Sequence, residues 1–308
     1  MHTRFYHDPV FAEHMTGPGH PERPERVQAI AAALEAEAFH FLDRAAAVEG
    51  TLEAIERCHP ESFVRKIAKA VPDSGLARVE YDTVLSPKSF AAAMHAVGGA
   101  CAGVDDLMSG AASSVFVAGR PPGHHAERQS AMGFCLFNTA AIAARHAQAV
   151  HGLERIAIVD WDVHHGNGTQ DIFWEDPSVL YASTHEMPLY PGTGATTEIG
   201  AGNIVNAPLR SGDGSEPFRE AFKSRILPAL HRFQPDLVIV SAGFDAHYRD
   251  PLGHLKLSEG DFDWATSRLL DIADRYCDGR LLSVLEGGYD LTGLANSVAA
   301  HIQRLMTG

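Results

Sequence analysis

Acidic and imidazole side chains alternate with apolar ones in the segment Asp160-Trp-Asp-Val-His164. This segment directly follows Ile156–Val159, an apolar, β-branched run that predicts a buried strand. Because successive side chains of a strand point to opposite faces, Asp160, Asp162 and His164 are predicted to project from one face. A turn rich in glycine follows and ends the strand.

Two carboxylates and an imidazole that are buried together are destabilising unless a cation compensates for them. We therefore expect a metal ion here, although on the residues alone these groups could also cap the strand or pair with each other. Asp162 and His164, together with Asp245 after a later buried strand, offer one nitrogen and two oxygen ligands. Three protein ligands leave an open coordination position on zinc or a similar divalent ion, which favours a catalytic site.

Three further side chains could act on a substrate at such a metal. His124 and His125 follow the buried run Ser114–Ala118 and could supply a general acid and base. Tyr289 stands on a Gly-Gly turn, where its hydroxyl could stabilise a developing oxyanion or where the ring could simply pack. The sequence has neither a Gly-x-Ser-x-Gly elbow nor a phosphate-binding loop, so metal-assisted hydrolysis is the reaction class that remains.

Strands and helices that could position these residues alternate along the chain. The predicted strands are Phe5–Tyr6, Ser114–Ala118, Ile156–Val159, Ser178–His185, Asp236–Asp245 and Arg280–Leu285. One predicted helix begins at Pro24. The other predicted helices cover Thr51–Val71, Phe90–Met108, Asn138–Val150, Phe218–Leu230 with a kink at Pro228, Ser258–Tyr276 and Leu294–Leu305. Glu80–Leu85 is expected to be a short connection.

This alternation predicts one α/β domain over residues 1–308, with a doubly wound, largely parallel sheet and helices on both faces. Ligands of such sheets bind beyond the carboxyl ends of the strands, where the polar clusters of this sequence lie. His20 and Glu22 belong to a loop rich in Gly and Pro, and the residues leave open whether they line the site or only fix the loop.

The net charge is −14, from 25 Lys and Arg against 39 Asp and Glu, which opposes binding to nucleic acid or to an anionic membrane. The N-terminus lacks an apolar signal core, and no apolar run is long enough to span a membrane. The four cysteines are widely spaced without a Cys-x-x-Cys motif. We therefore expect a reduced, cytoplasmic protein.

Six motifs occur in order along the chain: Arg120-Pro-Pro-Gly-His-His-Ala126, Gly133-Phe-Cys-Leu-Phe-Asn138, Asp160-Trp-Asp-Val-His-His-Gly-Asn-Gly-Thr-Gln170, Tyr190-Pro-Gly-Thr-Gly194, Ser241-Ala-Gly-Phe-Asp-Ala246 and Glu286-Gly-Gly-Tyr289. Together they resemble the zinc-dependent histone deacetylase and acetylpolyamine amidohydrolase family. The third motif is similar to class II deacetylases and bacterial deacetylase-like amidohydrolases. The resemblance implies the arginase/deacetylase fold and hydrolysis of an N-acetyl amide to acetate and a free amine.

Roles follow from the resemblance position by position. It makes Asp162, His164 and Asp245 the ligands of one zinc ion, and His125 the base that deprotonates the metal-bound water. It makes His124 the electrostatic partner of that base, and Tyr289 the group that polarises the acetyl carbonyl. A tyrosine at this position implies an active deacetylase, since vertebrate class IIa enzymes with histidine there are weak on acetyl-lysine.

The resemblance also implies a potassium ion and a substrate channel. Asp160 would hydrogen-bond His124 and face the potassium site, whose ligands would be main-chain oxygens around Asp160, Asp162, His164 and Thr184 and the hydroxyl of Ser183. Phe134 and Tyr190 would form the walls of the channel, and the Gly133 carbonyl would accept the substrate N–H.

Substrate choice is expected to depend on Leu252, because polyamine-selective relatives have an acidic residue at that position. Leucine favours acyl-lysine in a protein or peptide, while an acetylated small amine remains the alternative. Two other classes stay open: a binuclear manganese ureohydrolase, for which Ala246 and His247 do not provide the usual second Asp, and a catalytically silent sensor of acyl ligands. A homo-oligomer is compatible with the sequence.

Asn167 departs from the Asp that many class I members of this family have behind the second histidine. A neutral amide stabilises an imidazolium less than a carboxylate does. We therefore hypothesise that His125 stays neutral to lower pH than it would beside an aspartate.

Overall fold

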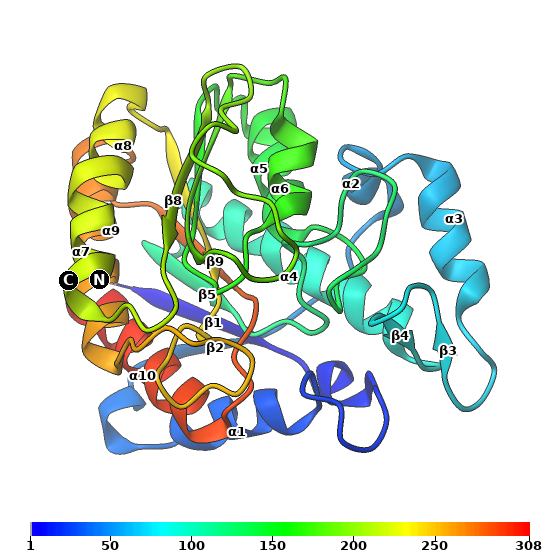
Figure 1. Ribbon diagram of the computed structural model, residues 1–308. Helices are drawn as coiled ribbons and strands as arrows, with labels where there is room; N and C mark the ends of the chain where they lie inside the picture. The colour runs from blue at the N-terminus through cyan, green and yellow to red at the C-terminus, as the bar shows by residue number, and fades with distance from the viewer. Residues whose placement is uncertain (1) are drawn as a thin grey trace.

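Eight parallel strands form one central sheet in the structure, a computed structural model that describes residues 2–308 (Figure 1). Their spatial order is β2 (Asp43–Ala46), β1 (Thr3–His7), β5 (Ser114–Val117), β10 (Leu281–Leu285), β9 (Leu237–Ala242), β6 (Ile156–Asp160), β7 (Val179–Glu186) and β8 (Ile204–Leu209). A two-stranded antiparallel ribbon, β3 (Ala77–Arg78) and β4 (Val84–Leu85), lies outside this sheet.

The chain builds the two halves of the sheet before it fills the middle. Strands β1, β2 and β5 form one half, and β6, β7 and β8 form the other. Strands β10 and β9 then lie between β5 and β6. The loops that follow β5, β10, β9 and β6 therefore meet at one edge of the sheet.

Helices cover both faces of the sheet (Figure 1). One face carries α4 (Ser89–Ser109), α5 (Thr139–His151) and α6 (Asn167–Phe173), and the other carries α1 (Glu25–Ala33), α7 (Ser215–Ala221), α8 (Leu227–Phe233), α9 (Glu259–Tyr276) and α10 (Leu291–Thr307). The shorter helices α2 (Leu52–Glu56) and α3 (Glu61–Ala70) lie beside this arrangement. The prediction of a doubly wound, parallel α/β sheet is confirmed.

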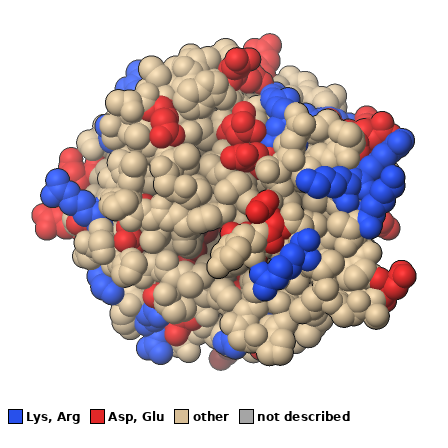
Figure 2. All heavy atoms as spheres, turned by 45° about the vertical axis from the view of Figure 1, so that its right-hand side comes forward, with Lys and Arg blue, Asp and Glu red and all other residues tan. Residues whose placement is uncertain are grey.

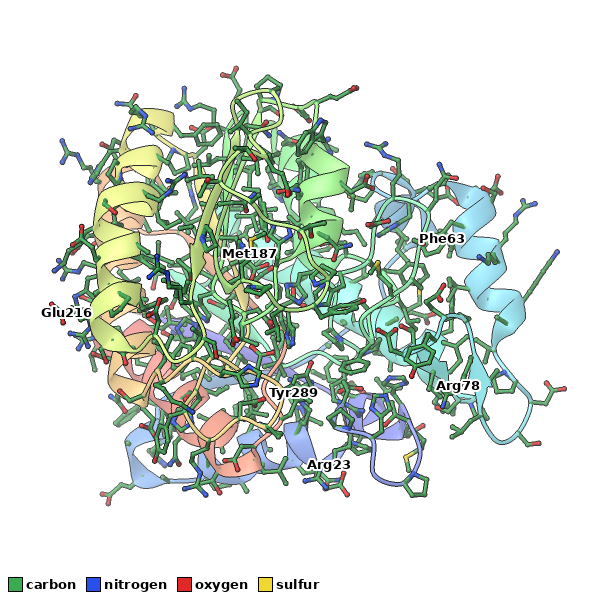
Figure 3. All side chains as sticks on the ribbon, viewed as in Figure 1. Arg23, Phe63, Arg78, Met187, Glu216 and Tyr289 are labelled. Atoms are coloured by element: carbon green, nitrogen blue, oxygen red, sulfur yellow. The ribbon has the colours of Figure 1, made fainter. Side chains whose placement is uncertain are left out.

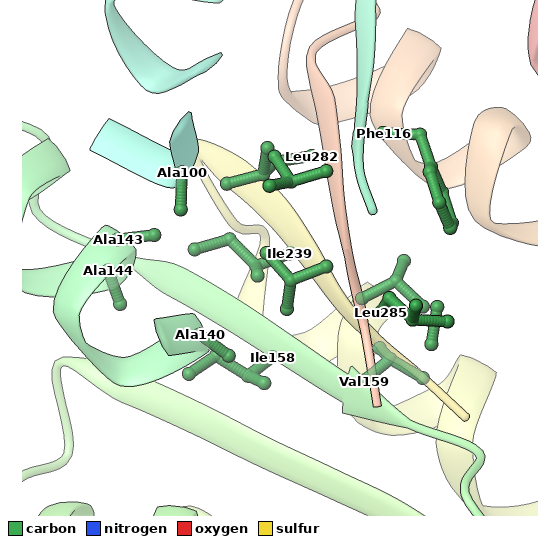
Figure 4. Close-up of a cluster of buried hydrophobic side chains, with 14 of the residues drawn as sticks. Ala100, Phe116, Ala140, Ala143, Ala144, Ile158, Val159, Ile239, Leu282 and Leu285 are labelled. Atoms are coloured by element: carbon green, nitrogen blue, oxygen red, sulfur yellow. The ribbon is translucent and has the colours of Figure 1, made fainter. Parts of the chain in front are cut away.

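The core between α5 and the centre of the sheet is made of β-branched and aliphatic strand residues against small helix residues (Figure 4). Ile158 and Ile239 are completely buried on neighbouring strands. Ala140, Ala143 and Ala144 of α5 face them and allow the helix to approach closely. Burial of each aliphatic strand side chain contributes about 1.5–3 kcal/mol, which explains why the apolar run before Asp160 forms a central strand.

The predicted helices are largely present, and their ends follow the residues expected to cap them. The Asn138 side chain accepts a hydrogen bond from the Ala141 N–H at 3.0 Å, and Gly152 ends α5 in the left-handed conformation. Ser258 and Asp261 form the predicted capping box of α9.

Two predictions of secondary structure were wrong. Thr51–Val71 is not one helix, because Pro60 separates α2 from α3. Glu80–Leu85 is not only a connection, because β4 pairs with β3. Pro228 lies inside a helical run that continues without a break from α7 through a π-helical turn at Phe222–Ile226 into α8, so the regular α-helical pattern is interrupted directly before the proline.

The edge strands β2 and β8 were not predicted. Half of the side chains of β2 are exposed, and its sequence Asp-Arg-Ala-Ala has no apolar run. Strand β8 contains Pro208, which an edge strand tolerates because one side of its backbone has no partner. Among residues 2–308, no helix combines the length and the apolar character needed to cross a membrane.

Candidate active site

The predicted metal ligands, the two histidines and Tyr289 lie in the loops after the four central strands. His124 and His125 follow β5, and Glu286 and Tyr289 follow β10. Asp245 follows β9, while Asp162 and His164 follow β6. Tyr289 lies in the middle of the molecule in the view of Figure 3, among these loops. The parallel sheet thus brings together side chains that are far apart in the sequence.

The prediction that Asp160, Asp162 and His164 project from one continuous strand was wrong, because β6 ends at Asp160. The N–H of Trp161 still donates to Ser241 of β9, but the next three backbone N–H groups donate to carboxylates instead of to a neighbouring strand. The N–H of Asp162 donates to Asp160 Oδ1 at 3.1 Å, and that of His164 donates to Asp162 Oδ1 at 2.9 Å. Aspartate side chains that bond the backbone two residues on favour turns over strands.

Asp162, His164 and Asp245 nevertheless converge on a candidate metal site. Each offers one ligand atom, and these atoms all lie within 4.8 Å of one another. The Nδ1 atom of His164 lies 3.1 Å from Asp162 Oδ1 and 3.1 Å from Asp245 Oδ2. All three residues are buried.

The electrostatics of this cluster fit a bound cation. Burial, together with the negative charge of Asp162, raises the pKa of Asp245 to about 7. Two buried carboxylates this close resist full ionisation unless positive charge compensates for them. One imidazole nitrogen and two carboxylate oxygens are ligands that zinc accepts.

The two adjacent histidines have opposite electrostatic environments. Burial alone would lower the pKa of His124, but the charges of Asp162 and Asp160 raise it well above its ordinary value. His124 Nδ1 lies 2.9 Å from Asp160 Oδ2, and this oxygen also accepts a hydrogen bond from the Tyr181 hydroxyl at 3.0 Å. By contrast, burial and the charges of His124 and His164 lower the pKa of His125 well below its ordinary value.

The proton position on His125 follows from the side chain of Asn167. The Asn167 amide nitrogen donates to Glu127 Oε1 at 2.8 Å, so the Asn167 oxygen faces His125. His125 Nδ1 lies 2.8 Å from that oxygen and must donate to it. Its other ring nitrogen, Nε2, therefore has a free lone pair, as a general base requires.

Glu286 is a site residue for which the sequence predicted no role of its own. Its carboxylate is completely buried and accepts the backbone N–H groups of Gly123 at 2.7 Å and His124 at 3.1 Å. It also accepts the hydroxyl of Ser241 at 3.1 Å. Burial raises the pKa of Glu286 to about 7. Glu286 therefore links the loop after β10 to the loop after β5 and to strand β9.

A pocket of about 260 Å³ opens onto these groups and is lined by Asp82, His125, Gly133, Phe134, His164, Leu189, Tyr190, Leu252 and Tyr289. All four residues predicted to contact a substrate, Gly133, Phe134, Tyr190 and Leu252, are among them. Tyr190 is 39% exposed and Tyr289 only 8%, so the pocket extends from the surface inward to Tyr289.

The pocket wall depends on an unusual backbone conformation. Gly133 and Phe134 have φ angles of 56° and 69°, and a Cβ atom at Gly133 would overlap the His125 ring. Asp82 holds this turn, because its Oδ1 atom accepts the Gly133 N–H at 3.1 Å. Asp82 was not predicted as a site residue. The only feature of the sequence that could have indicated its role is an acidic side chain in a predicted loop.

Glu22 fixes its loop and does not line the site, two roles that the residues alone left open. It is completely buried and pairs with the guanidinium groups of Arg120 and Arg26. Arg26 in turn donates to the carbonyl oxygens of Gly288 at 2.6 Å and of Glu286. Through Arg26, Glu22 therefore also holds the turn that carries Tyr289.

His20 instead lies close to the pocket. Its ring packs edge-on against Phe134, with 4.8 Å between the ring centroids. His20 does not itself line the pocket that contains Phe134. The contact of His20 therefore supports Phe134, which is part of the pocket wall.

Two of the residues predicted to hold potassium, Ser183 and Thr184, belong to strand β7, which lies beside Asp160. Ser183 of β7 pairs in register with Asp160, and its hydroxyl lies 2.8 Å from His185 Nδ1. The buried hydroxyl of Thr184 has no hydrogen-bond partner within residues 2–308. This hydroxyl is not the atom expected to bind potassium, because the expected ligand is the Thr184 main-chain oxygen and the Thr184 side chain points to the opposite face of β7 from that of Ser183.

Comparisons with known proteins agree on one family. Residues 20–305 match the family described as histone deacetylase domain. Histone deacetylase 14, chloroplastic, of Arabidopsis thaliana is 40% identical over 93% of this chain and 73% of its own length. The histone deacetylase-like amidohydrolase of Pseudomonas aeruginosa is 36% identical over 93% of this chain and 81% of its own.

The fold comparison is equally specific. The crystal structure of the HDA15 HD domain superposes with a TM-score of 0.93 at 38% identity, over 99% of this chain and 88% of that one. Fold and site thus define a hydrolase that acts on amides, built on the arginase/deacetylase fold. The chain belongs to the histone deacetylase family.

Proposed function

We propose that this protein is a zinc-dependent amidohydrolase that removes acetyl or similarly short acyl groups from lysine side chains. The observation that supports this most is the pocket in which His125, His164 and Tyr289 line one space with Phe134 and Tyr190. Two aromatic walls suit an extended alkyl chain, and the polar groups behind them suit its amide.

Asp162, His164 and Asp245 would hold one zinc ion. The ion would supply an electrophile that polarises a carbonyl and acidifies water. His125 would accept the proton of the attacking water at Nε2, because its Nδ1 proton is directed at Asn167. His124, hydrogen-bonded to Asp160, would remain positively charged and stabilise negative charge beside it.

Tyr289 would donate its hydroxyl proton in a hydrogen bond to the acyl oxygen as negative charge develops there. Burial and the charge of Asp245 raise the pKa of Tyr289 well above its ordinary value, so the hydroxyl keeps its proton. The Gly133 carbonyl would accept the substrate N–H. Potassium held near Asp160, Ser183 and Thr184 would stabilise the loop after β6.

Acyl-lysine is the substrate that the apolar rim favours, since Leu252 offers no charge to a second ammonium. One observation favours the alternative, an acetylpolyamine or another small acetylated amine. The carboxylate of Asp82 also lines the pocket and would attract a second positive charge. One oxygen of this carboxylate, Oδ1, already accepts hydrogen bonds from Gly133 and Thr83, which weakens its attraction for a second ammonium.

A deacetylation assay with a fluorogenic acetyl-lysine peptide, with and without a chelator, tests the proposal. We expect activity that the chelator abolishes and that Zn²⁺ restores. A parallel assay with N8-acetylspermidine tests the substrate class, and a kcat/KM equal to or above that for the peptide would reverse our preference. No activity on any acetyl amide would favour a silent sensor of acyl ligands.

A binuclear manganese ureohydrolase would instead hydrolyse arginine or agmatine with two metal ions near Asp245. The residue pair after Asp245 does not favour this reading, since His247 lies 3.5 Å from Glu259 and not at the cluster. Manganese content and guanidine hydrolysis would distinguish the two enzymes.

We also propose a reducing, cytoplasmic location and a partner that is not nucleic acid. All four cysteines are free and buried, which fits a reducing, cytoplasmic environment. Basic and acidic side chains are interspersed over the face shown in Figure 2 and separated by uncharged surface. With the net charge of −14, this face suits a small amide or a peptide better than nucleic acid.

A further inference from the structure

A second cluster of metal-ligating side chains lies where helices α4 and α5 end. Asp105 belongs to the last turns of α4, and His146 and His151 belong to the end of α5. The Nε2 atoms of His146 and His151 lie 2.8 Å and 2.7 Å from the same oxygen, Oδ1 of Asp105. One nitrogen from each histidine and this oxygen all lie within 4.8 Å of one another.

The helix ends supply a second reason to expect a cation here. Helix α4 ends at Ser109 and α5 at His151, so the negative ends of two helix dipoles lie near the cluster. A carboxylate close to the C-terminus of a helix adds negative charge to the end that already carries it, which is unfavourable without a positive partner. Asp105 therefore needs a cation more than an ordinary surface aspartate does.

The three side chains are both held in place and accessible. Helices α4 and α5 pack against each other, which fixes the distance between their ligands. The side chains of His146 and His151 are 12% and 23% exposed, and that of Asp105 is 52% exposed. An ion from solvent can reach the cluster without any opening of the fold.

We propose that Asp105, His146 and His151 form a site for a second divalent transition-metal ion, of which Zn²⁺ is the representative. Two imidazole nitrogens and one carboxylate oxygen are ligands that zinc, nickel and copper share. Around a tetrahedral zinc with bonds of about 2.0–2.1 Å, ligand atoms stand about 3.3 Å apart. The present N–O distances need to widen by about 0.5 Å, which rotation of these partly exposed side chains allows. Water fills the fourth position.

The positive charge of Arg57 is expected to weaken metal binding at this site, so a change of this residue tests the proposal. Its Nη1 atom lies 3.2 Å from His146 Nδ1 and donates to it, so the proton of the neutral ring is on Nε2. Metal binding through Nε2 moves that proton to Nδ1, and Arg57 must then turn away. Arg57 has another partner, Glu53, at 3.1 Å. Removal of the Arg57 charge is expected to strengthen metal binding.

Isothermal titration of the holoenzyme, already loaded with one equivalent of zinc, tests the site with Zn²⁺ alone. We expect wild type to bind a second equivalent and Asp105→Asn to bind it more than about tenfold more weakly. Arg57→Gln should bind more tightly than wild type. The control His231→Gln removes an exposed histidine that hydrogen-bonds Tyr276 at 3.1 Å, and its titration should match wild type.

A thermal melt provides the independent readout, because an ion that links α4 to α5 stabilises the folded state. The second equivalent should raise the Tm of wild type and not that of Asp105→Asn or of His151→Gln. Wild type that binds a single zinc, or variants that titrate like it, would overturn the site. The titration rests on the proposed zinc site being filled first; because Asp105, His146 and His151 lie outside that site, loss of only the second equivalent in Asp105→Asn distinguishes failure of this site from failure of the proposed function.

Discussion

Removal of the buried Glu22 carboxylate is expected to be one of the most destabilising single changes in this protein. Glu22 pairs with Arg120 and Arg26, and all three side chains are completely buried. Its Oε2 atom also lies 3.3 Å from His14 Nε2. In Glu22→Ala, two guanidinium groups lose their shared counter-charge, and breaking a buried pair in this way costs about 3–5 kcal/mol.

The contribution of Glu22 to the free energy of unfolding is also expected to depend on pH. Burial alone would raise the pKa of Glu22, but the charge of Arg120 and the His14 contact hold it well below its ordinary value. A depressed pKa contributes stability at pH values above about 4.3, where the carboxyl group of the unfolded chain is ionised. That contribution is lost as the pH falls from there towards the lower pKa of the folded state.

Urea denaturation followed by circular dichroism, at pH 7 and at pH 3, measures both effects. Wild type should lose stability between these pH values, and Glu22→Gln should lose less because it has no carboxyl group to protonate. Glu25→Gln is the matched control, since Glu25 is an exposed residue in the first turn of α1. A free energy of unfolding for Glu22→Ala within about 1 kcal/mol of wild type would refute the reasoning.

Other predictions concern activity. Tyr289→Phe removes the proposed hydrogen bond to the acyl oxygen and should lower kcat by about 10²–10³-fold with little change in KM, measured on an acetyl-lysine peptide. Asn167→Asp should raise the pKa of His125, so the acidic limb of the kcat/KM profile moves to higher pH; an unchanged limb would defeat this idea. Asp82→Asn should reduce kcat/KM for N8-acetylspermidine about tenfold more than for the peptide if the Asp82 charge binds a second ammonium; equal losses on both substrates would show that Asp82 only holds the Gly133 turn.

The sheet and the convergence of the site were predictable because their signals are local. Apolar runs such as Ile156–Val159 form central strands wherever helices can cover both faces. Once these strands are parallel, the polar residues after them meet at one edge. Asp162, His164 and Asp245 could therefore be grouped from the amino-acid sequence alone.

Other features depend on contacts between distant segments, which no local pattern contains. The position of Glu286 beneath Gly123 and His124 follows from the insertion of β10 beside β5. Asp82 lines the pocket because the β3–β4 ribbon brings its loop to Gly133. The turn after Asp160 also differs from a strand because its aspartates bond the backbone, a competition that alternation of residue types does not reveal.

The order in which the chain supplies the strands has a consequence for folding during synthesis. Strands β5 and β6 emerge from the ribosome well before β9 and β10, which separate them in the finished sheet. Until then, both present unpaired, apolar edges of the kind that aggregate or recruit chaperones. A ribosome-bound chain that stops before residue 236 lacks Asp245 and Tyr289 as well as these strands. Catalytic competence and protection from aggregation therefore arrive together, with strands β9 and β10.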